Sequence, residues 1–262
     1  MKTSSRLRIR FYQVAVLAAL LVAWHWATTL DLLPRFFFGQ PLPVMSRIAS
    51  WFGSGRIYPH LGITLLETAL AFLIGGALAT FVGLVLGLSP VASAIADPYI
   101  KAVNAMPRVI LAPIFAVWFG LGVWSKVALG ITLVFFIVFF NVYQGVREVS
   151  PELIANARML GASRRQLVRH VYLPSATSWV FSSLHTSVGM AFVGAVVGEY
   201  LGSARGVGYL IHQAEGVFDI DTVLAGIAVL TLFALLLDGL VTLVEGRLHA
   251  WRPAPGGAER GG

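Results

Sequence analysis

Ionisable side chains within long apolar runs are the residues of this sequence that could act on a polar solute. Glu67, His185, Glu199 and Asp238 all occupy such runs. Charged groups in apolar segments are costly and often mark a path for ions or polar molecules. Glu67, His185 and Glu199 are therefore candidate pathway residues. Ser187 is a further candidate, because its hydroxyl could bind an anion. As alternatives, the two glutamates reach interfacial water and His185 is hydrogen-bonded among helices, and we expect Asp238 to pair with an arginine.

The sequence offers little for catalysis. It contains no cysteine, and its six histidines show no metal-ligand spacing. The three lysines, Lys2, Lys101 and Lys126, do not follow a glycine loop of the kind that cradles ATP phosphates. Neither a G-x-S-x-G motif nor a pair of histidines with a nearby glutamate occurs. We therefore predict no catalytic residue, no metal site and no cofactor bound by this chain, which is not expected to be an enzyme.

The composition predicts that lipid surrounds most of the protein. Of 262 residues, 57% are hydrophobic and 12% are charged, and the mean hydropathy is +0.80. These values lie outside the range of soluble domains. The net charge of +7 could suggest a nucleic-acid partner, but basic residues beside apolar spans have a topological meaning first, so we expect none.

Six apolar runs are long enough, or nearly so, to cross a membrane. They cover about residues 11–30, 61–88, 105–121, 127–145, 179–201 and 223–246. The third is short, and Pro98, Pro107 and Pro113 predict a helix that is broken near its start. The first is too long for the apolar part of a signal peptide. The predicted fold is an all-α integral membrane protein with six transmembrane helices.

Basic residues predict the orientation of these helices. If the N-terminus is cytoplasmic, fourteen of the nineteen lysines and arginines fall on the cytoplasmic side, as the positive-inside rule requires. Residues 1–10 are then a basic cytoplasmic tail, residues 11–250 the transmembrane domain and residues 251–262 a disordered cytoplasmic tail.

Small residues and one amphipathic segment predict how the spans pack. Residues 75, 79, 83 and 87 are glycine or alanine, and residues 194, 198 and 202 are glycine. This four-residue spacing lets a neighbouring helix approach closely. Val44, Ile48, Trp51 and Phe52 have helical spacing and predict a short helix that lies on the membrane surface or covers the ends of other spans.

The longest cytoplasmic loop, residues 147–178, predicts a helical hairpin. Ser150, Pro151 and Glu152 are typical of a helix start. Gly161 predicts a break, and Ser163 can cap a second helix. Such a basic and partly apolar hairpin must lie on lipid headgroups or dock in a groove of another protein.

The spacing Ala157, three residues, Gly161, nine residues and then Val171-Tyr172-Leu173-Pro174 resembles the EAA loop of binding-protein-dependent ABC import permeases. Further motifs resemble the nitrate, sulfonate and taurine branch of that family. They are Leu33-Pro34, Asp97-Pro98, residues 106–113, residues 118–122, residues 194–199 and residues 206–210. Together the resemblance covers roughly residues 30–250.

The resemblance implies that the loop between spans four and five docks on a cytoplasmic ATP-binding subunit. The implied docking residues are Glu152, Ala155, Asn156, Ala157, Gly161, Ala162, Ser163, Arg164, Leu167 and Pro174. Ala155, Asn156 and Ala157 stand where the family has Glu-Ala-Ala, so the usual acidic contact is missing. Glu152 lies one helical turn earlier and could replace it.

The resemblance also implies a function and a set of partners. The chain would be the permease subunit of an ATP-driven importer in the bacterial inner membrane, with both termini cytoplasmic. A periplasmic or lipid-anchored binding protein would deliver a small sulfonate-, nitrate- or taurine-like anion, and two ATPase subunits would bind ATP and Mg²⁺ beneath two permease copies. The alternatives are a vitamin-precursor or aromatic-acid permease of the same family and a self-sufficient secondary transporter.

Overall fold

In the computed structural model, which describes residues 2–175, 179 and 183–249, the regular structure is helical throughout those ranges. The first half contains α1 (Lys2–Thr29), α2 (Arg35–Phe38), α3 (Pro41–Gly53), α4 (Tyr58–Gly87), α5 (Pro90–Ala105), η1 (Arg108–Ile110) and α6 (Leu111–Phe119). The second half contains α7 (Val123–Arg147), α8 (Pro151–Met159), α9 (Arg164–Leu167), η2 (Val168–Tyr172), α11 (Leu184–Leu201), α12 (Val207–Gly216) and α13 (Ile220–His249). The predicted tail at residues 251–262 lies outside the described residues.

Four helices are long and apolar enough to cross a membrane, namely α4, α7, α13 and residues 8–29 of α1. A fifth span forms if α5 is joined to the segment from η1 through α6, which bends away from it by 76°. The break lies at Pro107, where a proline was expected to interrupt the helix. The predicted 105–121 span is thus the second arm of a longer bent unit.

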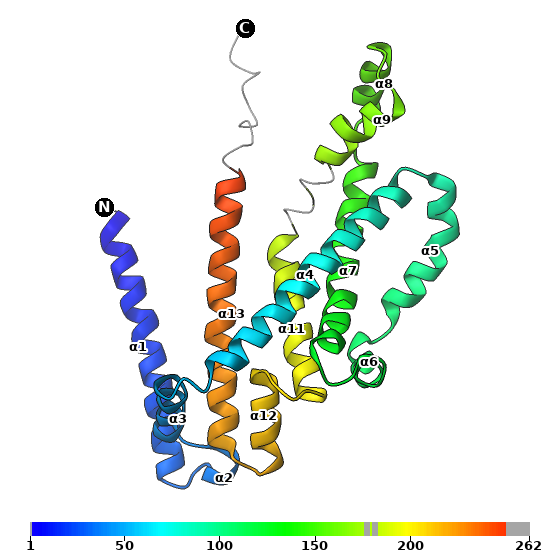
Figure 1. Cartoon of the computed structure of the whole chain (residues 1–262). Coiled ribbons are helices and arrows are strands. Elements are labelled where there is room, and N and C mark those ends of the chain that lie inside the picture. Colours follow the sequence, from blue (N-terminus) through cyan, green and yellow to red (C-terminus); the bar gives the residue numbers. More distant parts are fainter. Residues whose placement is uncertain (1, 176–178, 180–182, 250–262) are drawn as a thin grey trace.

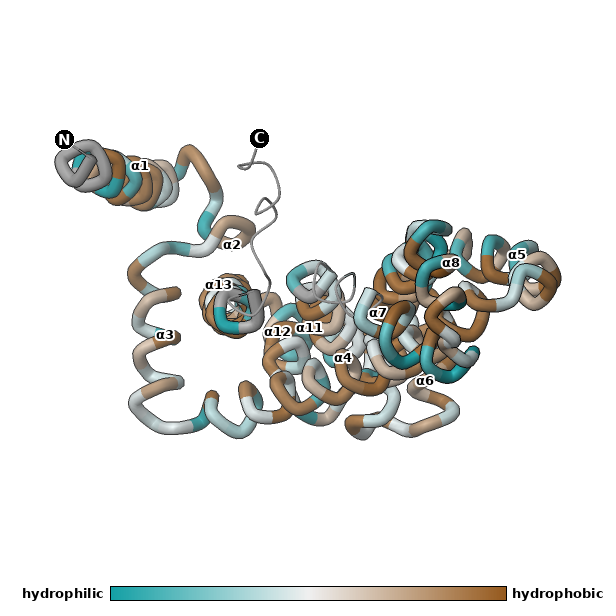
Figure 2. Tube along the Cα trace, turned by 90° about the horizontal axis from the view of Figure 1, so that it is seen from above, coloured by the Kyte–Doolittle hydropathy of each residue, from teal (hydrophilic) through white to brown (hydrophobic). Residues whose placement is uncertain are grey.

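The helices form an elongated bundle with two distinct ends (Figure 1). We call the end that carries α8 and α9 the hairpin end, and the end that carries α2, α3 and α12 the loop end. The start of α1 and the last turns of α13 point toward the hairpin end (Figure 1). Viewed down the bundle, α1 stands at one edge and α5 at the other, with α4, α7 and α11 between them (Figure 2).

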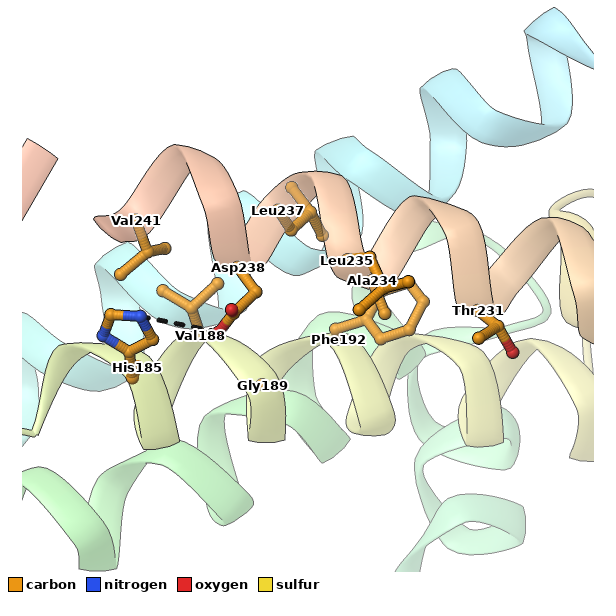
Figure 3. Close-up of a pocket in the computed structure, with 10 residues that line it drawn as sticks. All are labelled: His185, Val188, Gly189, Phe192, Thr231, Ala234, Leu235, Leu237, Asp238 and Val241. Carbon is orange, nitrogen blue, oxygen red and sulfur yellow. Dashed lines mark ion pairs between the residues drawn. The ribbon is translucent and has the colours of Figure 1, made fainter. Parts of the chain in front are cut away.

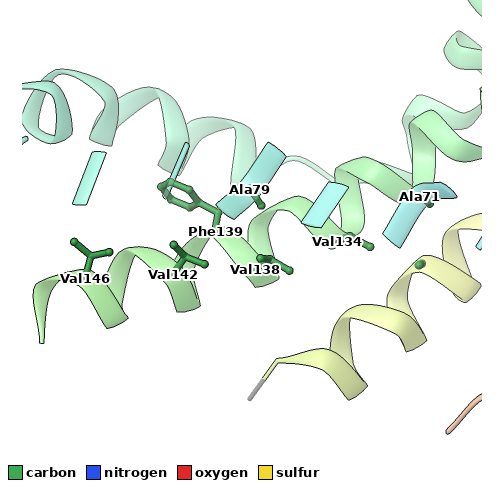
Figure 4. Packing of buried hydrophobic residues seen from close by; sticks show 8 residues of the cluster. Ala71, Ala79, Val134, Val138, Phe139, Val142 and Val146 are labelled. Atoms are coloured by element: carbon green, nitrogen blue, oxygen red, sulfur yellow. The ribbon is translucent and has the colours of Figure 1, made fainter. Parts of the chain in front are cut away.

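The centre of the bundle is the contact between α4 and α7. Gly75, Gly83 and Gly87 of α4 meet the α7 side chains Val134, Val142 and Val146, respectively. The buried cluster around this seam contains Ala71, Ala79, Val134, Val138, Phe139, Val142, Val146 and Ala191 (Figure 4). The predicted small-residue stripe of α4 is therefore a helix-packing surface.

A second close contact joins α11 to α7. A Cβ atom built on Gly194 would lie 2.5 Å from the Cα atom of Gly130, so only hydrogen atoms fit between the two backbones. Gly198 faces Lys126 of α7 in the same way. The second predicted stripe thus also packs helices together, as expected for small residues in a membrane bundle.

Two features differ from the expectations. Lys126, expected in an exposed loop, lies within α7 and is only 1% exposed. The helix begins four residues earlier than the apolar run because Gly122 and Val123 start it, so the lysine is carried into the bundle. Helix α3 does exist, and Ile48 and Trp51 pack against a core that includes Val229 of α13, so this face covers a span.

Gly75 and Gly76 provide a matched test of the α4–α7 contact. A Cβ at Gly75 would lie 3.2 Å from both Ile131 Cα and Val134 Cβ, whereas nothing lies within 4 Å of a Cβ at Gly76. Gly75→Val should destabilise the protein by about 2 kcal/mol more than Gly76→Val, because only the first overpacks the seam. Thermal unfolding of the two variants in detergent measures the difference, and equal midpoints would contradict the packing interpretation.

Candidate functional site

The hairpin between α7 and α11 is the candidate site, and its first helix is fixed by local signals. Ser150 Oγ accepts a hydrogen bond of 3.2 Å from the Leu153 N–H. Pro151 occupies the first helical position and Glu152 the first turn, where a carboxylate is favoured by the helix dipole. The helix α8 therefore begins where the sequence predicted.

A glycine turn ends α8. Gly161 has φ of +82°, a left-handed conformation that is costly for most other residues. The Gly161 N–H donates to Arg158 O at 2.9 Å, and the Ala162 N–H donates to Ala157 O at 3.0 Å. This pair of hydrogen bonds is a Schellman motif, so the predicted break is a defined turn.

A reciprocal capping box starts the second helix. Ser163 Oγ accepts from the Gln166 N–H at 3.3 Å, and Gln166 Oε1 accepts from the Ser163 N–H at 2.8 Å. The short helix α9 then continues into η2, which is a π-helix. Residues 173–175, including Pro174, remain helical. Pro174 has no N–H to donate to the preceding turn, which favours such a local widening.

The tip of the hairpin presents apolar side chains outward. Met159 is 80% exposed and Leu160 is 88% exposed. Beside them lies a shallow cavity of about 290 Å³ between the two helices, lined among others by Ala157, Leu160 and Gly161. Water does not favour two large apolar side chains at a projecting tip, so this surface is suited to insertion into a partner's groove.

The hairpin is tied to the bundle behind it. Tyr172 packs on the α4–α7 cluster, and Ser175 Oγ donates to Gly145 O of α7 at 3.2 Å. The ring of Trp179 lies against Gly145, where no side chain could be accommodated without displacement. The segment that follows the hairpin therefore contacts the helices that form the core directly.

The predicted docking residues lie together on this hairpin. Exposed are Glu152, Ala155, Asn156, Gly161, Ser163, Arg164 and Pro174, while Ala157 and Ala162 are half-buried and Leu167 is buried. Leu167 thus supports the hairpin from within. Arg158 and Arg164 also line a second cavity between the hairpin and Leu88 at the end of α4.

The candidate pathway residues form two separate groups. Glu67 and Glu199 contact each other near the loop end, and both are at most 1% exposed within the protomer. His185 lies fourteen residues before Glu199 on α11, which places it about 21 Å away along the helix axis. Ser187 is fully buried, and its Oγ has no hydrogen-bond partner among the described residues.

His185 lies at a cavity of about 290 Å³ between α11 and α13 (Figure 3). Its Nε2 is 3.5 Å from Asp238 Oδ1 and its Nδ1 is 2.9 Å from Glu245 Oε1. Asp238 therefore pairs with a histidine, and the expectation of an arginine partner is wrong. The reason is that α11 crosses α13 at this level and brings the imidazole between two carboxylates that are seven residues apart.

Sequence reasoning missed three features of these sites. Lys126 and Glu245 were not singled out, because their partners come from other helices. The exposed pair Met159 and Leu160 was not singled out either, although two large apolar residues directly before a turn glycine are a detectable signal of an exposed tip.

Comparison with known proteins gives a consistent result. Residues 71–250 match the family model described as binding-protein-dependent transport system inner membrane component. The chain is 31% identical over 252 residues to the putative aliphatic sulfonates transport permease protein SsuC of Bacillus subtilis, covering 96% of this chain and 91% of the relative. It is 31% identical over 243 residues to the taurine transport system permease protein TauC of Escherichia coli, covering 91% and 88%. Relatives named for riboflavin and for formylaminopyrimidine transport also match.

The fold has a counterpart among solved structures. A chain of the MetNI methionine ABC transporter, in an inward-facing conformation, superposes with a TM-score of 0.56 and 18% sequence identity. The match covers 73% of this chain and 92% of that chain. At this identity the likeness describes the fold alone.

The capping box makes a local stability prediction. Ser163→Ala removes the acceptor for the Gln166 N–H and should weaken the second helix by about 1 kcal/mol. Trypsin cleavage after Arg164 and Arg165 should then become about fivefold faster, because cleavage follows local opening. Ser163→Asp keeps an acceptor and should be cleaved at the native rate, whereas equal rates for all three proteins would refute the role of the cap.

Proposed function

Because this chain belongs to the family of binding-protein-dependent transport system inner membrane components, we propose that it forms the membrane passage of an importer for small sulfonates. The chain is a permease subunit of an ABC importer. The proposal adds how energy enters the subunit, how the subunit is placed in the membrane and what it carries. The single observation that carries the proposal is the rigid hairpin with an apolar tip.

ATP is bound and hydrolysed, with Mg²⁺, by a separate ATPase that receives this tip. Met159 and Leu160 would enter a groove on the ATPase, and Arg158 and Arg164 flank them with positive charge. Glu152, at the exposed start of α8, would supply the acidic contact that Ala155 cannot make. Each of the two hairpin helices begins with a side-chain cap, so movement of the groove would move the hairpin as a unit.

The hairpin end is the cytoplasmic end in this proposal. The start of α1 and the last turns of α13 point the same way as the hairpin (Figure 1), and four arginines lie on the hairpin between residues 158 and 169. Basic residues favour the cytoplasmic side. With α11 counted as a span, although its 18 described residues barely suffice, the chain crosses the membrane six times.

Two permease copies with two ATPases would then form one passage. Closure of the ATPases on ATP would draw the two hairpins together and open the passage toward the binding protein. Large apolar side chains remain exposed on α5 and α6, including Val91, Val117 and Trp118. These surfaces are available to a second copy and to lipid.

The cargo is a small anion with a sulfonate group, on the strength of the two relatives named for sulfonate and taurine transport. A passage for an anion should not present carboxylates. Glu67 and Glu199 do not face solvent within the protomer, because both side chains are at most 1% exposed.

Leu160 tests the docking of the ATPase. Leu160→Asp should reduce the ATPase that co-purifies with the tagged permease about tenfold, because a charge replaces an apolar side chain that is buried on docking. Leu160→Met keeps the apolar volume and should retain a stoichiometric ATPase. Full retention by Leu160→Asp would exclude the tip from the docking surface.

The cargo class is tested in vesicles that contain the permease, its ATPase and its binding protein. Taurine or a short alkanesulfonate should stimulate ATP hydrolysis, and omission of the binding protein should remove the stimulation. Stimulation by riboflavin or an aromatic acid, with none by sulfonates, would replace the proposed cargo. Uptake by vesicles that hold the permease alone would instead indicate a secondary transporter.

A further inference from the structure

Three ionisable side chains lie close together inside the bundle near the loop end. They are Glu67 of α4, Lys126 of α7 and Glu199 of α11, and each is at most 1% exposed. We call them the buried acid–lysine cluster. Such groups are expensive in a low-dielectric interior unless their charges and hydrogen bonds are balanced, so the protonation of the two acids decides whether the cluster is stable.

Glu199 is surrounded as an ionised carboxylate would be. Its Oε1 accepts from Thr64 Oγ1 at 2.6 Å, and its Oε2 accepts from the Gly208 N–H at 2.7 Å. Gly208 is the second residue of the ten-residue helix α12, so the carboxylate caps a helix N-terminus, where negative charge is favoured. A Cβ at Gly208 would lie 2.6 Å from Val196 O and 2.9 Å from Glu199 Cβ, and this close approach to α11 explains the glycine.

The loop before α12 is held against the same helices. The Nδ1 atom of His60, on α4, lies 3.1 Å from the backbone nitrogen of Gly206 and 3.0 Å from its carbonyl oxygen. It accepts from the first or donates to the second, according to the tautomer. The Val207 N–H donates to Thr64 Oγ1 at 3.3 Å. Glu199 therefore sits at the point where α4, α11 and α12 are joined.

Glu67, unlike Glu199, is not surrounded by hydrogen-bond donors. No N–H or hydroxyl donor of the described residues reaches its Oε2. Its carboxyl instead lies beside the carboxyl of Glu199, and both side chains are at most 1% exposed. Two buried carboxylates side by side repel each other, whereas a protonated carboxyl can donate its hydrogen to a neighbouring carboxylate.

The single positive charge of Lys126 can compensate only one of the two glutamates. Its Nζ donates to Leu121 O at 2.6 Å and to Gly122 O at 3.0 Å. In the described part of the chain it forms no direct ion pair with either acid. With Lys126 and Glu199 charged, ionisation of Glu67 would leave one uncompensated negative charge inside the bundle.

We propose that the pair Glu67 and Glu199 is a proton-binding site, in which Glu67 carries one proton and donates it to the Glu199 carboxylate. The cluster is then neutral, and every charged group in it has hydrogen-bond partners. Glu67 acts as a positioning residue, since it holds Glu199 against the start of α12. The same geometry could instead hold a sodium or potassium ion between two carboxylates, and the experiment separates the two ligands.

Infrared spectroscopy of the permease, purified with its ATPase in lipid nanodiscs, detects a protonated carboxyl group directly. The native complex at pH 7 should show the carbonyl band of a buried carboxylic acid, and the band should shift when the glutamates carry ¹³C. Glu67→Gln should remove the band, whereas Glu215→Gln, at an exposed position of α12, should leave it. Absence of the band from the native complex would overturn the proposal without any variant having to fold.

Thermal unfolding in the same nanodiscs supplies an independent readout. Glu67→Gln retains a neutral donor to Glu199 and should unfold within about 2 °C of the native protein, while Glu67→Ala should unfold about 4 °C lower or more. A loss in Glu67→Gln as large as in Glu67→Ala would overturn the proposal. A native midpoint that rises with Na⁺ or K⁺, and ceases to do so in Glu67→Gln, would establish a cation site in its place. Neither measurement requires a cargo, so both are independent of the proposed cargo.

Discussion

The close approach of α4, α7 and α11 is the contact on which the rest of the structure depends. Lipid is as apolar as leucine, so helices in a membrane gain little by hiding leucines from it and associate through close packing instead. Gly75, Gly83 and Gly87 let α7 lie directly on α4, and the pair Gly130 and Gly194 does the same for α7 and α11. Larger residues at these positions would separate the helices that carry every site described above.

The packed centre also supports the hairpin that projects from the bundle. The hairpin is held by three local devices, which are a serine cap, a glycine turn and a capping box. Its far side rests on the same core through Tyr172 and the Gly145 contact. The hairpin is therefore connected to α4 and α7 by packing and hydrogen bonds as well as by the chain itself.

The ionisable side chains at the two ends of α11 differ in their exposure. At the hairpin end, His185 lies partly exposed between Asp238 and Glu245. At the loop end, Glu199 is fully buried and joins three helices. Carboxyl groups thus contact a partly exposed histidine in one place and form an internal junction in the other.

The sequence by itself determined the features that depend on neighbouring residues. Apolar run length, the prolines before residue 108, and the Ser150, Gly161 and Ser163 signals predicted helices, a bend and a hairpin, since span length, capping and left-handed φ are local properties. The glycine spacing likewise identified the packing faces of α4 and α11, although not their partners. Only the tertiary structure decided that Lys126 is buried with two glutamates, that Asp238 pairs with His185, and that Glu67 Oε2 has no donor among the described residues. These outcomes depend on which helices cross and at what level, and that information lies in contacts between residues more than 50 positions apart.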